Sequence, residues 1–197
     1  MSTIQILEEH TNFLRCSTEW NNHLYSGSED ETIRKWDSSG ECVEVLEGHT
    51  GSVRCLTVWN NHLYSGSWDE TIRKWDSSGE CVGVFEGHTD IVCCLTIWNN
   101  HLYSGSCDKT IRKWNSSGEC IGVIEGHTSS VWCLTVVKDH LYSGSSDKTI
   151  RKWGEYYFKY YKFLPNKTKV DVFNAMLLFK RLKLPKDVQL SIIRKLI

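Results

Sequence analysis

Short runs of alternating apolar and polar residues, separated by polar turns, make up most of this chain. In residues 57–67 (TVWNNHLYSGS), β-branched and aromatic residues lie on both sides of Asn60 and Asn61, a pattern that predicts a strand, a turn and a second strand. Residues 70–75 (ETIRKW) predict a third strand. After a polar turn, residues 81–85 (CVGVF) predict a fourth. No helical periodicity separates these strands.

The same pattern returns every 39 residues. Four short strands per repeat, with no helix between them, predict one β-propeller blade per repeat. The fold is therefore expected to be all-β, with four blades of four antiparallel strands. Three markers fix the register: LYSGS at 24–28, 63–67, 102–106 and 141–145; TIRKW at 32–36, 71–75, 110–114 and 149–153; and GHT at 48–50, 87–89 and 126–128, with EHT at 9–11.

The order of elements predicts how the ends of the chain meet. The chain begins with TIQILE at 3–8, which aligns with the fourth-strand sequence CVEVLE at 42–47. The repeats stop after a third strand, at Trp153. We therefore expect the N-terminal segment to supply the outer strand of the last blade, so that no long sheet edge stays unpaired.

These repeats resemble the WD40 repeat over residues 3–153, through GHT followed by LYSGSxDxTIRKWD. The short blades with VRCL, SGSWD and SGEC are most similar to the substrate-binding propellers of F-box/WD proteins. The sequence departs from the family pattern where Glu9 replaces the Gly before His10, and where Asn115 and Gly154 replace the Asp of the Trp-Asp pair. Four repeats are also fewer than the seven usual in the family. The resemblance implies a protein-binding scaffold and not an enzyme.

One His, one Ser, one Asp and one Trp recur at fixed spacing in every repeat. Ser, His and Asp suggest a catalytic triad, but an enzyme needs one triad beside a cleft and an oxyanion hole. The WD40 resemblance implies a buried hydrogen-bond chain from Trp to Ser to His to Asp, whose groups can satisfy one another away from water. We expect these tetrads to be structural and no residue to be catalytic. The tetrads are His10, Ser26, Asp30 and Trp36; His49, Ser65, Asp69 and Trp75; His88, Ser104, Asp108 and Trp114; and His127, Ser143, Asp147 and Trp153.

Composition argues against several classes of function. The formal net charge is −1, so the chain as a whole has no pull toward nucleic acid or an anionic membrane. No stretch approaches the roughly 18 continuous apolar residues of a membrane span. The residues after Met1 have neither the basic nor the apolar region of a secretory signal. We expect a cytoplasmic or nuclear protein.

The cysteines and histidines do not predict a metal site or a cofactor. Seven of the nine cysteines recur at two positions of the repeat and not as a CxxC pair, so we expect reduced thiols that pack as small apolar residues. Four of the eight histidines belong to the tetrads, and the other four lie in the expected Asn-rich turns.

The repeats differ mainly at positions expected on one face. Residues 42–80 and 81–119 are identical at 30 of 39 positions. By resemblance to WD40 domains, the variable first-strand position and the position before the Asp lie on the top face, around the central channel. Exposed Arg and Trp there predict a protein-binding hot spot, with a solvated rim as the alternative. The candidates are Arg15, Glu29, Arg54, Trp68, Cys93, Cys107, Trp132 and Ser146.

In the F-box/WD proteins that this sequence resembles, arginines at the first-strand position bind phosphate on the substrate peptide. The equivalent residues here are Arg15 and Arg54, whose guanidinium groups can bond phosphate bidentately. The resemblance thus implies a protein or phosphopeptide partner.

After the last repeat, residues 154–197 form a separate basic and aromatic segment. Apolar spacing predicts amphipathic helices over 170–185 and 186–197. The sequence LPKDVQLSIIRKL is similar to the opening helix of an F-box, which would make 185–197 a contact for a cullin-ligase adaptor. A helical hairpin that caps or dimerises the propeller, or a degenerate remnant, are the alternatives. We therefore divide the chain into a propeller at 1–153 and a tail at 154–197.

The leading hypothesis is a protein-binding scaffold, in its sharper form the substrate-recognition subunit of a cullin-type ubiquitin ligase. A structural or shortened WD-repeat protein without a specific partner is the alternative. Four blades could close alone under strain, stay open, or combine with a second copy into an eight-bladed ring. The sequence leaves these three arrangements open.

Overall fold

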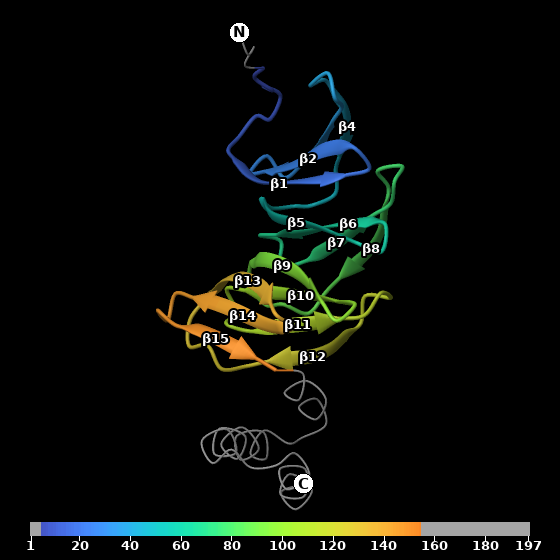
Figure 1. Cartoon of the computed structure of the whole chain (residues 1–197). Helices are drawn as coiled ribbons and strands as arrows, with labels where there is room; N and C mark the ends of the chain where they lie inside the picture. Colours follow the sequence, from blue (N-terminus) through green and yellow to red (C-terminus); the bar gives the residue numbers. More distant parts are fainter. Residues whose placement is uncertain (1–4, 155–197) are drawn as a thin grey trace, which may run out of the picture. The chain divides into compact units, whose positions relative to one another are not determined.

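The computed structural model describes residues 5–154, which contain fifteen strands and no helix (Figure 1). The strands are β1 (Leu14–Trp20), β2 (His23–Ser28), β3 (Ile33–Trp36), β4 (Cys42–Leu46), β5 (Val53–Trp59), β6 (His62–Ser67), β7 (Ile72–Trp75), β8 (Cys81–Phe85), β9 (Val92–Trp98), β10 (His101–Ser106), β11 (Ile111–Trp114), β12 (Cys120–Ile124), β13 (Val131–Val137), β14 (His140–Ser145) and β15 (Ile150–Trp153). They form four antiparallel sheets, one per repeat. The predicted all-β fold is confirmed.

Each blade is an antiparallel meander whose turns follow from local sequence. Between β5 and β6, Asn60 and Asn61 have positive φ values of 47° and 56°. Asn tolerates this left-handed backbone better than other residues with a Cβ, and successive positive φ values match the twist of a two-residue hairpin. The last blade has Lys138 and Asp139 in the same conformation.

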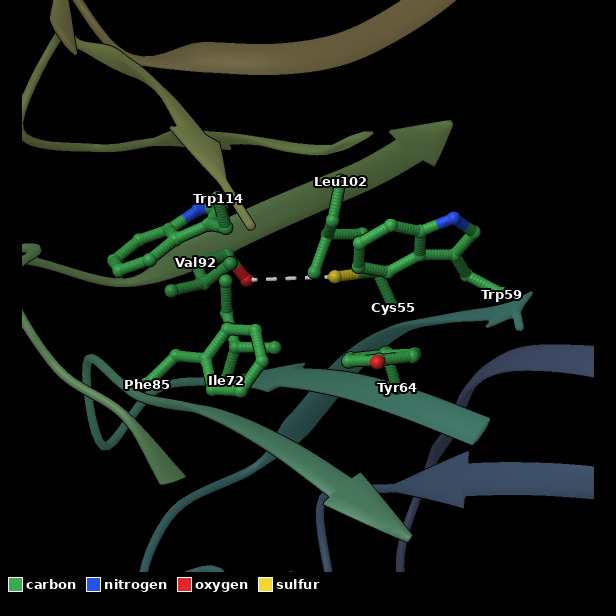
Figure 2. Close-up of a cluster of buried hydrophobic side chains, with 8 residues drawn as sticks. All are labelled: Cys55, Trp59, Tyr64, Ile72, Phe85, Val92, Leu102 and Trp114. Carbon is green, nitrogen blue, oxygen red and sulfur yellow. Dashed lines mark hydrogen bonds between the residues drawn. The ribbon is translucent and has the colours of Figure 1, made fainter. Parts of the chain in front are cut away.

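Neighbouring blades pack through a buried apolar layer. Between the second and third blades, Ile72 and Phe85 from one side meet Val92 and Leu102 from the other (Figure 2). The packing is close at Gly66, where an added Cβ would come within 2.6 Å of a methyl carbon of Val92. Glycine at this position therefore lets the first strand of the next blade approach closely.

The last blade differs from the predicted four-stranded blade. Its sheet contains only β13, β14 and β15 among the described residues, and residues 5–10 form no strand. The prediction that the N-terminal segment completes this blade within the same chain is wrong for residues 5–8, and residues 3–4 lie outside the described part. The physical reason is that the first and last blades do not meet within residues 5–154, where Cys133, from the same blade, is the one residue within 4 Å of a Cβ added at Gly144.

The two ends of the row of blades consequently expose side chains that are buried elsewhere. Ile150 is 79% exposed, whereas its equivalents in the second and third blades, Ile72 and Ile111, are buried. The described blades belong to one compact unit, Met1–Gly154. The division at 153/154 and the helices expected in the tail stay predictions, because residues 155–197 lie outside the described part.

The close contact between blades predicts a position-specific cost for one added methyl group. Gly66→Ala should lower the free energy of unfolding by about 1–3 kcal/mol, because the methyl group would overlap Val92 and Cys55. Gly83→Ala is the matched control, since its Cβ would have no neighbour closer than 3.6 Å. Urea unfolding of both variants checks this. Equal losses at the two positions would contradict the close packing between blades.

Candidate functional site

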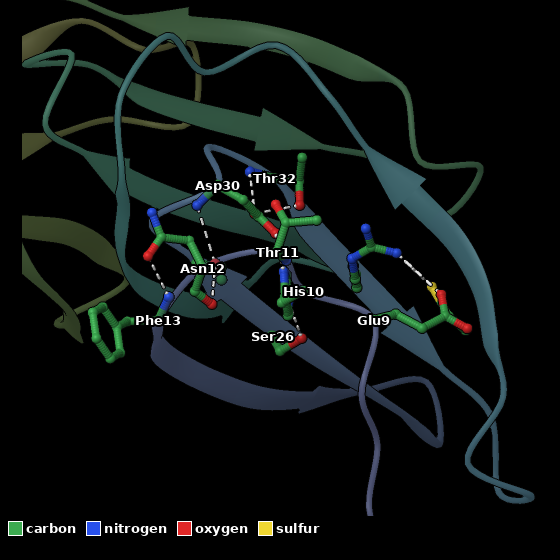
Figure 3. Close-up of polar contacts among 12 residues, drawn as sticks. Glu9, His10, Thr11, Asn12, Phe13, Ser26, Asp30 and Thr32 are labelled. Atoms are coloured by element: carbon green, nitrogen blue, oxygen red, sulfur yellow. Dashed lines mark hydrogen bonds and ion pairs between the residues drawn. The ribbon is translucent and has the colours of Figure 1, made fainter.

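The four tetrads form continuous hydrogen-bond chains. In the second blade, the indole Nε1–H of Trp75 donates to Ser65 Oγ at 2.8 Å. Ser65 Oγ lies 2.7 Å from His49 Nε2, and His49 Nδ1 lies 2.7 Å from Asp69 Oδ2. Ser65 is completely buried and His49 nearly so. The equivalent atoms in the other three blades lie at 2.6–2.8 Å (Figure 3 shows His10, Ser26 and Asp30 of the first blade).

The aspartate of each tetrad also fixes the backbone around it. Asp69 accepts hydrogen bonds from the backbone N–H groups of Thr50 and Thr71, and from the hydroxyl of Thr71. It thereby joins the loop before β5 to the turn between β6 and β7. Burial alone would raise the pKa of Asp69, but the hydrogen bonds from His49 and Thr71 overcome this and hold it well below its ordinary value. The pKa is lowered in the same way in the other blades, to about 2 for Asp30.

This geometry suits a structural role better than catalysis. The serine hydroxyl is enclosed between an indole donor and an imidazole, in a buried position that recurs four times. Burial also lowers the pKa of His88, which favours the neutral imidazole. A neutral imidazole can donate to the aspartate through Nδ1–H while accepting from the serine at Nε2.

The top-face candidates come together in pairs, one pair per blade. A register irregularity in the first strand, between Val53 and Cys55 in the second blade, sets Arg54 out of the regular ladder. The backbone N–H of Trp68 donates to the carbonyl of Ser52 at 3.0 Å, which brings Trp68 beside the same bulge. Equivalent bonds form in the other blades. We define the top face as the eight residues at these positions: Arg15, Glu29, Arg54, Trp68, Cys93, Cys107, Trp132 and Ser146.

The chemistry of each pair is different, yet its two members always contact each other. Arg15 forms an ion pair with Glu29. The guanidinium carbon of Arg54 lies 5.8 Å from the ring centroid of Trp68, and Trp68 is 50% exposed.

In the remaining two pairs, the two members also contact each other. The Sγ atoms of Cys93 and Cys107 are 3.3 Å apart, and Trp132, 45% exposed, donates its indole N–H to Ser146. Burial raises the pKa of Cys93 and keeps it a neutral thiol. Comparison of the repeats identified these eight positions as variable, but it did not predict that they contact each other in pairs. The only signal of this pairing in the sequence is that the two positions of a blade change together.

Within residues 5–154, no three His, Cys, Asp or Glu side chains lie close enough together to hold a metal ion. The same part of the chain contains no helix that is long and apolar enough to span a membrane.

Comparison with known proteins identifies the repeats. The family model "WD domain, G-beta repeat" matches residues 1–37, 40–76, 79–115 and 118–154. No curated protein sequence matches the chain. The chain is similar to the crystal structure of the computationally designed Ika4 protein, with 29% identity and a TM-score of 0.70 over 77% of this chain and 99% of Ika4.

Two other similar structures are longer than the four blades. The WD40 β-propeller domain of Doa1 is 26% identical with a TM-score of 0.71, over 76% of this chain and 53% of the Doa1 chain. The computationally designed Ika8 protein is 30% identical with a TM-score of 0.68, over 75% of this chain and 48% of Ika8. This chain therefore spans about half the length of both.

The tetrad geometry predicts the effect of removing a single donor. Trp75→Phe keeps an aromatic ring but leaves Ser65 without its indole partner, so we expect a loss of about 1–3 kcal/mol in the free energy of unfolding. Thermal unfolding monitored by circular dichroism measures this loss. Trp68→Phe, an exposed tryptophan of the same blade, serves as the control and should leave the melting temperature nearly unchanged. An unchanged melting temperature for Trp75→Phe would rule out the structural role.

Proposed function

The chain belongs to the WD40-repeat family, and we propose that it is a non-enzymatic scaffold that binds other proteins through its top face. Domains of this family generally mediate protein–protein interactions. The observation that carries the proposal is the contrast between the tetrads, which are the same in all four blades, and the top-face pairs, which differ in every blade. A rigid frame that presents four different pairs suits recognition of one specific partner.

The pair of Arg54 and Trp68 is the strongest candidate for the energetic centre of this face. Arg and Trp are the residue types most often found at binding hot spots. Trp68 offers a half-exposed apolar surface, and Arg54 beside it offers a planar cationic group. Trp132, on another blade, adds a second exposed aromatic surface.

A phosphorylated peptide is the partner that this chemistry favours. A guanidinium group can bond two phosphate oxygens at once, and the neighbouring Trp68 ring can pack against the peptide. Arg54 and Arg15 are not equally available to bind a phosphate group. Arg15 is already paired with the Glu29 carboxylate, which a phosphate would have to displace.

This difference predicts that two substitutions weaken peptide binding unequally and that a third strengthens it. With a library of phosphoserine and phosphothreonine peptides, Arg54→Ala should weaken binding at least tenfold, and Arg15→Ala should weaken it less. Glu29→Gln should strengthen it, because the competing carboxylate is removed. Fluorescence anisotropy with phosphorylated peptides and their unphosphorylated counterparts measures these affinities. If binding of the selected peptides is indifferent to phosphate and to Arg54, the phosphate-binding role is wrong.

We further propose that the scaffold serves as the substrate-recognition subunit of a cullin-type ubiquitin ligase. The support is the similarity of the blades to F-box/WD propellers and of residues 185–197 to the start of an F-box helix. These residues lie outside the described part of the chain, so their contact with an adaptor rests on sequence alone. Cytoplasmic or nuclear location is part of the same proposal.

We therefore expect the blades to fold and to bind peptide without the tail, and the adaptor contact to need the tail. Deleting residues 166–197 should keep the strand-rich circular dichroism spectrum and the peptide affinity, but should abolish co-precipitation of a cullin adaptor from cell extract. Val188→Glu and Ile192→Glu in the full chain test the same contact without truncation. Adaptor recovery by the truncated chain would exclude the tail as its binding segment.

Assembly with a second copy into an eight-bladed ring also belongs to the proposed function. It is supported by the exposed ends of the row of blades.

A further inference from the structure

The N-terminal segment already lies where the outer strand of a preceding blade would lie. Inside the row, the β4 residue Glu44 packs against Gly79 of the second blade, and the β8 residue Phe85 packs against Gly118 of the third. Against the equivalent Gly40 of the first blade lie Gln5 and Leu7, which precede Glu44 and Phe85 by one and two repeats of the sequence.

Polar contacts hold this segment in position. The side chain of Gln5 donates to the carbonyl of Ser39, and Glu9 accepts from Arg34 at 3.1 Å. The segment therefore has the place of an outer strand, but the described chain has no three inner strands of a preceding blade beside it. At the other end, β13–β15 form a blade without an outer strand among the described residues.

The surfaces at the two ends correspond to the two sides of an internal junction. Val53 packs against Gly27 of the preceding blade and is fully buried. Its equivalent in the first blade, Leu14, is 57% exposed, and the equivalent of Gly27 in the last blade, Gly144, has no neighbour from another blade within 4 Å of an added Cβ. Leu14 and Gly144 therefore stand at the two positions that contact each other at an internal junction, but at the ends of the row each lacks this partner.

A similar relation holds for the larger apolar side chains. The buried cluster between the first two blades contains Ile33 from one side and Leu63 from the other. At the ends of the row, their equivalents Ile150 and Leu24 are both exposed. Side chains that are buried at this internal junction are thus exposed at the two ends of the row.

The end surfaces are also more polar than the internal ones. Val58 packs against the cluster that contains Trp20 of the preceding blade. The first blade has Glu19 in place of Val58, and the last blade has Val137, Lys138 and Asp139 in place of Trp20, Asn21 and Asn22. A junction between the two ends would therefore be less apolar than the internal junctions.

We propose that each end of the row binds the opposite end of a second copy of this chain, so that two copies form one eight-bladed ring. The three-stranded last blade of each copy docks on the first blade of the other, and residues 5–8 of that copy become its fourth strand. Similarity to about half of the Doa1 chain, a WD40 β-propeller domain, supports a row of blades with the curvature of a propeller that has more than four blades. The inference deepens the proposed assembly and does not depend on what the top face binds.

Sedimentation equilibrium of the full chain at micromolar concentration tests the proposal. We expect twice the monomer mass of 22.8 kDa. Leu14→Glu and Ile150→Glu should each give monomers that keep the strand spectrum, whereas Val82→Glu, an equally apolar exposed site on β8, should stay dimeric. Mixing the Leu14→Glu and Ile150→Glu chains should restore a dimer, because one junction then has two intact surfaces.

A substitution that restores the internal residue gives a second, independent measurement. Glu19→Val gives the first blade the apolar residue that the second blade has at this position, and it should tighten the dimer. A wild-type monomer, growth to masses beyond two copies, or dimers insensitive to Leu14→Glu and Ile150→Glu would overturn the ring. If the tail covered the end surface of the last blade, a second copy could not bind there and the wild-type chain would be a monomer. Peptide affinity measured on the Leu14→Glu monomer separates this outcome from failure of the top face, whose Arg54 and Trp68 lie within one copy.

Discussion

The hydrogen-bond chain from indole to hydroxyl to imidazole to carboxylate is the interaction on which the rest of this structure depends. It joins the loop that enters each blade to the second strand, the third strand and the turn between them. In the second blade, Asp69 alone bonds His49, two backbone N–H groups and one hydroxyl. Short strands with few residues per blade can keep a fixed shape because these polar groups are paired inside the blade and not with water.

The fixed frame explains how the protein can vary one face without losing its fold. The top-face residues stand at the bulge of the first strand and just before the tetrad aspartate, so the tetrad sets their backbone positions. The two side chains of a pair need to be compatible only with each other. An ion pair, a cation–π contact, a pair of thiols and an indole–hydroxyl bond meet this requirement in four different ways. Because each pair is satisfied locally, selection for a partner can change one pair and leave its neighbours intact.

Much of the fold could be predicted because its signals are local and repeated. The strand alternation and the Asn60-Asn61 turn predicted β5 and β6, and the spacing of His49, Asp69 and Trp75 predicted residues that the structure brings together. Among the described residues the last blade has three strands, and this could not be predicted because it depends on where the first and last blades lie relative to each other. The contact between Arg54 and Trp68 was missed for a similar reason, since a bulge and not regular strand pairing brings them together.

The central claim is that ionised, hydrogen-bonded aspartates hold each blade together, and their titration tests it directly. The lowered pKa values of Asp30, Asp69, Asp108 and Asp147 mean that the folded chain binds fewer protons than the unfolded chain below the ordinary value of 3.8. Their contribution to stability is therefore complete above that value and is lost as the pH falls through the folded pKa values. NMR of the aspartate carboxyl carbons should show these four groups still ionised below pH 3.8, with the native spectrum disappearing as they protonate. Four carboxyls that titrate at their ordinary value while the native spectrum persists would contradict the account.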